Sequence, residues 1–153
     1  MLTFVRNVTT AAPAEAVHAY LTDFTTVNEW DPRASSARRV RGSGAEGTVY
    51  ECEVAFARRT VPMRYTVTRV VPGEVVEWVG DSSWVRAHDV IRVVPRDGRT
   101  HVEYTTQYRY RHAPWLLDRL LHRAVSRLCD DARDGLQAAL EQPGRRTQSA
   151  PPR

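Results

Sequence analysis

Apolar and polar residues alternate along most of the chain, a period of two that is typical of half-buried β-strands. In residues 47–56 every second side chain from Thr48 to Phe56 falls on one face, while Glu51 and Glu53 fall on the other. Turn residues such as glycine, proline and paired arginines separate the alternating segments. The pattern predicts seven strands, at residues 2–9, 34–41, 47–56, 61–71, 74–79, 84–94 and 99–111.

Helical spacing of apolar residues interrupts the strands near the N-terminus. Pro13 is expected to open a helix over residues 14–21, because the missing N–H of proline needs no partner at the first helical position. Asp23 can cap a second, short helix that runs towards Trp30. The dipeptide Asp31-Pro32 ends it.

The last predicted element is a long helix from Pro114 to Glu141, whose leucines and alanines recur at spacings of three and four. Gly135 lies inside it, where glycine costs about 1 kcal/mol relative to alanine, so we expect a close crossing over the sheet there. Strands segregated from terminal helices predict an α+β fold with an antiparallel sheet. A curved seven-stranded sheet around one long C-terminal helix leaves a cavity between them, a usual place for a ligand.

Composition and charge exclude several classes of protein. Hydrophobic residues make up 42% of the 153 positions and no apolar run approaches the length of a membrane span, so we expect no stable membrane insertion. Arg6 and Asn7 stand where a signal peptide needs apolar residues, which favours a cytoplasmic protein. All 22 basic residues are arginine, which excludes a Schiff-base or phosphate-loop lysine.

The positive charge of the chain belongs largely to its C-terminal end. The formal charge is +4, and the tail from Gln142 to Arg153 holds three arginines and no acid. The remainder is close to neutral, so we expect no nucleic-acid partner. We expect residues 1–141 to form a single ligand-binding domain and residues 142–153 to be a disordered, basic, Pro-rich tail.

Neither the cysteines nor the histidines are spaced like metal ligands. Cys52 and Cys129 form no CxxC motif, and no HExxH motif is present. We therefore expect two free buried thiols, no metal and no cofactor. No Ser–His–Asp or Cys–His set emerges from the spacing either.

Asp89 is the sharpest candidate for chemistry. In residues 84–94 it shares a face with Ala87 and Ile91, while Arg86 and Arg92 mark the opposite face as the one in water. A carboxylate in an apolar site resists ionisation and can act as a general acid or base. The alternative is a structural aspartate that is hydrogen-bonded to backbone or hydroxyl groups.

The predicted inward faces also carry most of the tyrosines, whose rings can line a pocket and whose hydroxyls can donate hydrogen bonds. Ordinary core packing is the alternative for each of them, and for Trp30 a packing role at the end of the short helix is weighed against a gate to the pocket. The candidate ligand-binding residues are Trp30, Tyr50, Met63, Tyr65, Trp78, Asp89, Tyr104, Tyr108, Leu121 and Leu128. Tyr110 lies on the same predicted face.

Arginines at two places have two interpretations each. Arg6 either lies exposed at the end of its strand or faces inward and pairs with a carboxylate, and we expect it to be exposed. Arg119, Arg123 and Arg127 form a stripe on the last helix, interleaved with acids. Such a stripe is typical of a solvated face, and a docking surface for an acidic partner is the alternative.

Three segments resemble the START-like (SRPBCC) superfamily, which includes the polyketide cyclase/dehydrase and Bet v 1-like proteins. They are APAEAVHAYLTDFTTVNEWDP (12–32), GSGAEGTVYE (42–51) and GRTHVEYTTQYRY (98–110). The resemblance implies a helix-grip fold around a deep hydrophobic pocket. Members of the superfamily include carriers of lipids or quinones, hormone receptors, aromatase/cyclases and chaperone regulators. The Trp- and Arg-rich strand pattern of a true aromatase/cyclase is missing, so no catalytic residue is carried over.

Three functions are compatible with these features. The first is binding of a small hydrophobic or amphipathic molecule, such as a lipid, an isoprenoid or a polyketide, by a monomer or homodimer. The second is a cyclase or dehydratase in which Asp89 moves a proton beside a carbonyl and a tyrosine hydroxyl stabilises the enolate. The third is a protein-interaction module that uses the arginine stripe. We rank ligand binding first, the enzyme second and the protein-interaction module third.

Overall fold

Seven strands form an antiparallel sheet in the order β1-β7-β6-β5-β4-β3-β2. The computed structural model describes residues 1–56, 58–111 and 118–142, with the backbone alone at 118 and 119. The strands are β1 (Leu2–Thr10), β2 (Ala34–Arg41), β3 (Val49–Phe56), β4 (Arg59–Val71), β5 (Val75–Asp81), β6 (Val85–Arg96) and β7 (Arg99–Tyr110). The helices are α1 (Ala14–Thr22), the 3-10 helix η1 (Phe24–Thr26), α2 (Val27–Trp30) and α3 (Asp118–Glu141). The fold is the predicted α+β arrangement of a curved sheet and a long C-terminal helix.

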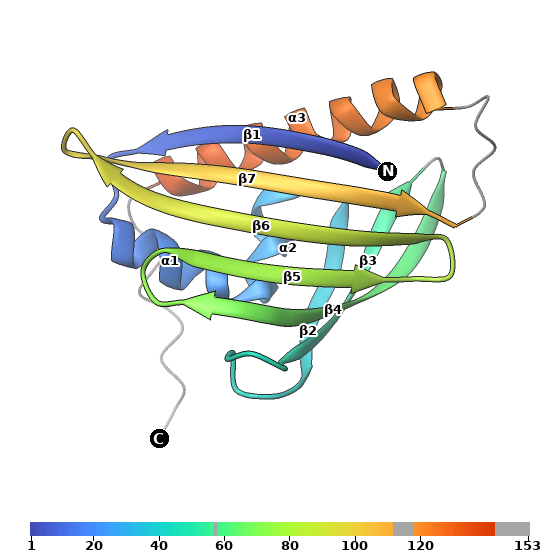
Figure 1. Ribbon diagram of the computed structural model, residues 1–153, viewed down its shortest axis with the longest axis horizontal. Coiled ribbons are helices and arrows are strands. Elements are labelled where there is room, and N and C mark those ends of the chain that lie inside the picture. Colours follow the sequence, from blue (N-terminus) through green and yellow to red (C-terminus); the bar gives the residue numbers. More distant parts are fainter. Residues whose placement is uncertain (57, 112–117, 143–153) are drawn as a thin grey trace.

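The sheet is curved, and its concave side shares a core with α3. Figure 1 shows β2 and β3 running steeply across the direction of β5, β6 and β7, and α3 running alongside β1. Consecutive strands from β2 to β7 are neighbours, so only β1 must reach its partner from the other end of the chain. Trp78, Ile91 and Leu136 are almost completely buried where the sheet and α3 face the same core.

The short helices join the two edge strands of the sheet. Pro13 directly precedes the first residue of α1 rather than occupying it. Asp23 accepts a hydrogen bond from the backbone N–H of Thr25 at 3.0 Å and so caps η1, as predicted. The backbone of Asp31 is extended, which ends α2 where the Asp-Pro dipeptide predicts.

Two hairpin turns are shorter than the gaps between the predicted strands. The strands predicted at 84–94 and 99–111 leave residues 95–98 for one turn, but Pro95 pairs with Thr100, so the turn within this segment is Asp97-Gly98. Both turn residues have positive φ, which a two-residue hairpin loop requires. The earlier turn was expected at residues 58–59, but Arg59 pairs with Phe56 and belongs to β4.

Gly135 marks a close crossing, although its partner is not the sheet. A Cβ atom at this position would lie 2.0 Å from the backbone oxygen of Trp30. The crossing expected over the sheet is therefore a crossing of α3 over the end of α2. Only a residue without a side chain lets the two helices approach so closely.

Arg6 corrects another expectation, because it is not an exposed strand-end residue. Its Nε donates to Asp130 at 2.8 Å and its Nη2 donates to the hydroxyl of Ser126 at 2.9 Å, both on α3. Its side chain is 21% exposed. The inward alternative is the right one, and the ion pair fastens β1 to α3.

Arg123 and Arg127 of the arginine stripe are exposed, and the side chain of Arg119 lies outside the described residues. So does the tail beyond residue 142. No helix in the described ranges is long and apolar enough to cross a membrane.

Candidate functional site

A cavity of about 580 Å³ lies between the concave face of the sheet and α3. Its wall is mostly aromatic and aliphatic, with side chains from η1, α2, the central strands and α3. This volume is in the range of pockets that hold a drug-sized molecule. The polar groups in the wall are few, so their positions decide which ligand chemistry fits.

The cavity has an exposed end and a buried end. At the exposed end lie Phe56 and Arg59 from the β3–β4 hairpin, Trp84 before β6, and Leu121 near the start of α3. Trp84 is 56% exposed. At the other end the wall consists of buried residues of η1, α2 and β5, namely Phe24, Val27, Trp30 and Trp78. A ligand that enters between the β3–β4 hairpin and the β5–β6 hairpin, which carries Trp84, therefore reaches a closed aromatic end.

Nine of the ten residues predicted to bind ligand line this cavity, and Tyr110 also lines it. Tyr50 does not. It is 1% exposed and packs against Phe24, with ring centroids 5.5 Å apart. Phe24 lies in the cavity wall, so Tyr50 is a core residue behind that wall. Trp30 is buried at the end of α2, which fits the packing role considered for it, and it lines the closed end of the cavity rather than an entrance that it could gate.

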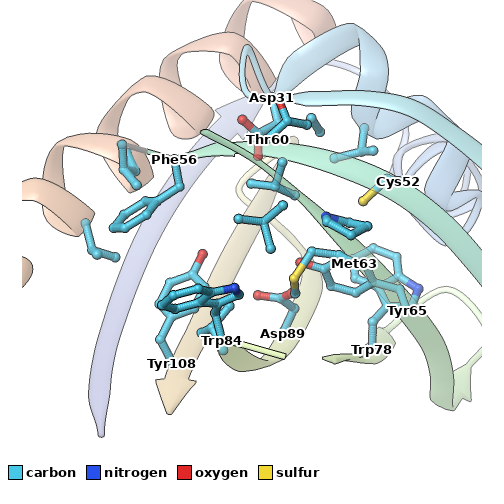
Figure 2. Close-up of a pocket in the computed structure, with 18 of the residues that line it drawn as sticks. Asp31, Cys52, Phe56, Thr60, Met63, Tyr65, Trp78, Trp84, Asp89 and Tyr108 are labelled. Carbon is cyan, nitrogen blue, oxygen red and sulfur yellow. The ribbon is translucent and has the colours of Figure 1, made fainter. Parts of the chain in front are cut away.

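Asp89 points into the middle of the cavity, as Figure 2 shows. It lies on β6 opposite Trp78 of β5 and Thr106 of β7, and it is 3% exposed. The hydroxyl of Tyr104 donates a hydrogen bond to its Oδ1 at 3.1 Å. Burial raises the pKa of Asp89 from 3.8 to about 6, and the hydrogen bonds from Thr106 and Tyr104 oppose this rise. The group changes charge near neutral pH.

The tyrosines around Asp89 stay protonated at neutral pH. Burial, and next the nearby charge of Asp89, raise the pKa of Tyr65, Tyr104 and Tyr108 well above 10. Figure 2 shows Tyr65 and Tyr108 on opposite sides of Asp89. All three hydroxyls therefore keep a proton to donate, and that of Tyr104 donates to Asp89.

Asp31 is a second carboxylate in the cavity wall, although its sequence context predicted only the end of a helix. Its Oδ1 accepts a hydrogen bond from the backbone N–H of Arg33 at 2.9 Å. Burial raises its pKa, and the hydrogen bond from Arg33 opposes the rise. Its position directly after the buried Trp30 was the available signal, because the residue that follows the helix stays close to the core.

Two indole nitrogens in the wall lack partners. Trp30 Nε1 and Trp78 Nε1 are buried and make no hydrogen bond within the described residues. Buried polar atoms are usually paired, so these are groups that a bound molecule can satisfy.

The described residues contain no group of three or more His, Cys, Asp or Glu side chains that could hold a metal ion. Cys52 and Cys129 are free and buried, as predicted. Burial raises the pKa of both thiols to about 12, so neither is a thiolate nucleophile at neutral pH. The arrangement can enclose an apolar body, donate several hydrogen bonds and exchange one proton at Asp89.

The sequence pattern of the family described as "Polyketide cyclase / dehydrase and lipid transport" matches residues 1–141. None of the curated proteins is similar enough in sequence to match. Among solved structures, the chain resembles the ZhuI aromatase/cyclase from Streptomyces sp. R1128, with 17% identity over 91% of this chain and 93% of that one and a TM-score of 0.76.

Two further solved structures have the same architecture. A START superfamily protein from Mycobacterium smegmatis is 11% identical over 90% of this chain and 96% of that one, with a TM-score of 0.76. A conserved protein from Geobacillus kaustophilus is 17% identical over 91% and 95%, with a TM-score of 0.73. At these identities the similarity shows the fold alone, which is the helix-grip fold of the START and Bet v 1-like proteins.

Proposed function

The chain belongs to the polyketide cyclase/dehydrase and lipid transport family, and we propose that it binds a small amphipathic molecule in the cavity between its sheet and α3. The observation that carries the proposal is the cavity itself, whose wall is mostly apolar with few polar groups and with Asp89 in its middle. Residues 1–141 act in this proposal as one ligand-binding domain.

The body of the ligand is apolar, because burial of apolar surface against this wall supplies the affinity. Each Å² of apolar surface removed from water contributes about 25 cal/mol. Trp30 and Trp78 at the closed end and Leu128 and Val125 of α3 offer flat and branched apolar contacts. A lipid, isoprenoid or polyketide-like skeleton suits this wall.

The polar group of the ligand lies at Asp89. The Tyr104 hydroxyl already orients this carboxylate, and Tyr65 and Tyr108 face the same space. A polar group that meets only the apolar part of the wall would lose its hydrogen bonds to water without replacement. The ligand therefore enters with its polar group aligned to the middle of the cavity.

A tryptophan that fills the cavity tests this proposal against a matched substitution outside it. Val85 of β6 lines the cavity, whereas Val94 of the same strand is 49% exposed and does not. N-phenyl-1-naphthylamine, a neutral dye that fluoresces in apolar surroundings, is titrated into the wild type and both variants. We expect Val85→Trp to weaken dye binding about tenfold or more and Val94→Trp to leave it unchanged. Equal binding by all three proteins would contradict the proposal.

A cyclase or dehydratase activity is the second candidate, and the position of Asp89 favours it. A carboxyl group with a pKa of about 6 can both take and return a proton near neutral pH. In this reaction Asp89 removes a proton beside a ligand carbonyl, and a tyrosine hydroxyl stabilises the enolate oxygen. Ring closure of a synthetic poly-β-ketone is expected to slow at least about a hundredfold in Asp89→Asn. An undiminished rate would exclude this role of Asp89.

A further inference from the structure

The charges in the cavity wall are unbalanced. Asp89 and Asp31 both line it, whereas the described lining residues include one basic side chain, that of Arg59. Arg59 lies at the exposed end, on the β3–β4 hairpin. The part of α3 in the wall contributes the apolar residues Leu121, Val125 and Leu128. His88, the neighbour of Asp89 on β6, is not among the lining residues and pairs with Glu77, so no basic side chain of the described wall pairs with Asp89.

We propose that the preferred ligand carries a positively charged nitrogen, and that Asp89 binds this cation within the aromatic wall of the cavity. The inference rests on the proposed function and names the chemical class of its ligand. A buried carboxylate is costly without an opposite charge, and an organic ammonium group supplies that charge at the moment of binding.

The rings around Asp89 fit the same cation. Tyr65, Tyr104 and Tyr108 line the cavity beside it, and Trp30 meets Tyr104 edge to face with ring centroids 6.0 Å apart. The faces of tyrosine and tryptophan rings attract ammonium groups. Because these tyrosines stay protonated, they add no second negative charge near Asp89 and can also donate to a neutral part of the ligand.

An anionic ligand, such as a fatty acid, fits this wall poorly. Its carboxylate would be buried with Asp31 and Asp89 and without a basic partner in the closed part of the cavity. Like charges in a low-dielectric space repel strongly. The charge pattern therefore discriminates among molecules that share one apolar body and differ in the polar group.

The groups that influence the pKa of Asp89 come from several elements around it. His88 is its neighbour on β6, and its ring lies 3.4 Å from Glu77 on β5. Burial is the main influence on the pKa of Asp89; the hydrogen bonds from Thr106 and Tyr104 and the charge of His88 favour ionisation, and the charge of Asp31 opposes it. When Asp89 takes up a proton as the pH falls through about 6, it can no longer neutralise a cation. Binding of a cation is therefore expected to weaken on acidification.

Three probes with one naphthalene body separate the possibilities. Isothermal titration calorimetry at neutral pH compares 1-naphthylmethylamine, 1-naphthylmethanol and 1-naphthoate with the wild-type protein. We expect the amine to bind about tenfold more tightly than the alcohol, and the carboxylate to bind most weakly. Asp89→Asn is expected to abolish the advantage of the amine. Asp97→Asn, a matched change at an exposed hairpin residue, is expected to leave it intact.

A second measurement keeps the test independent of the variants. In the wild type, the affinity for the amine is expected to fall on acidification through about pH 6, while the affinity for the alcohol stays constant. If the amine and the alcohol bind equally, or if Asp89→Asn keeps the preference, the inference is overturned. Binding of N-phenyl-1-naphthylamine reports on the proposed function separately, since that dye carries no charge.

Discussion

Replacing Asp89 by asparagine is expected to change how the stability of the protein depends on pH. Asparagine keeps an oxygen that can accept the hydrogen bond from Tyr104, but it cannot ionise. In the wild type the folded protein holds the proton of Asp89 up to a pKa of about 6, whereas the unfolded chain releases it near 3.8. Folding therefore takes up a proton between these values, and the free energy of unfolding falls as the pH rises through this window.

The size of the effect follows from the two pKa values. The gap between 3.8 and about 6 corresponds to a loss of about 3 kcal/mol of stability once the pH is well above 6. Of this loss, about 2 kcal/mol falls between pH 4.5 and pH 8. Asp31, whose pKa burial also raises, is present in both proteins, so the part of its effect that does not depend on the charge of Asp89 cancels in the difference between variant and wild type.

Urea unfolding followed by far-ultraviolet circular dichroism measures this difference at the two pH values. We expect Asp89→Asn to gain about 2 kcal/mol relative to the wild type on going from the acidic to the alkaline condition. The quantity compared is how the difference in unfolding free energy between the two proteins changes with pH, so the absolute stability of either protein does not matter. Parallel curves for the two proteins would refute the reasoning, because they would mean that Asp89 titrates alike in the folded and unfolded chain.

Two other predictions concern packing. Gly135→Ala is expected to lower the free energy of unfolding by more than about 2 kcal/mol because its Cβ meets the backbone oxygen of Trp30, whereas Asp134→Ala on the exposed face changes it by less than about 0.5 kcal/mol. A rise in the melting temperature of Gly135→Ala would show that α2 and α3 do not cross so closely. Cys52 and Cys129 are expected to resist iodoacetamide in the native protein and to react fully in urea, because both thiols are buried with pKa values of about 12. Mass spectrometry counts the modified thiols, and rapid labelling of the native protein would contradict their burial.

The strands and the orientation of Asp89 could be predicted from the sequence because a strand has a period of two. Once Arg86 and Arg92 identify the wet face of β6, the opposite face is fixed, and Asp89 is indeed 3% exposed. The face of β4 that carries Met63 and Tyr65 follows from the same rule. The alternating pattern is enough to predict which side chains of a strand point inward wherever one face of the sheet is buried.

Distant parts of the chain meet at Arg6, Gly135 and Asp31, whose contacts differ from those predicted. The partner of Arg6 is Asp130, 124 positions away, and the close neighbour of Gly135 is the backbone of Trp30. Asp31 enters the cavity wall because α2 ends against α3. Periodicity describes a single element and carries no information about which elements cross, so these contacts could not be predicted from it.

The central claim is that the space between the sheet and α3 is an open cavity that accepts an apolar molecule. A crystal structure of the protein with N-phenyl-1-naphthylamine tests it most directly. We predict density for the dye against Trp30, Trp78 and Leu128, with the Asp89 carboxylate facing it. A cavity filled by the protein's own side chains, with the dye elsewhere and Asp89 turned towards solvent, would contradict the account.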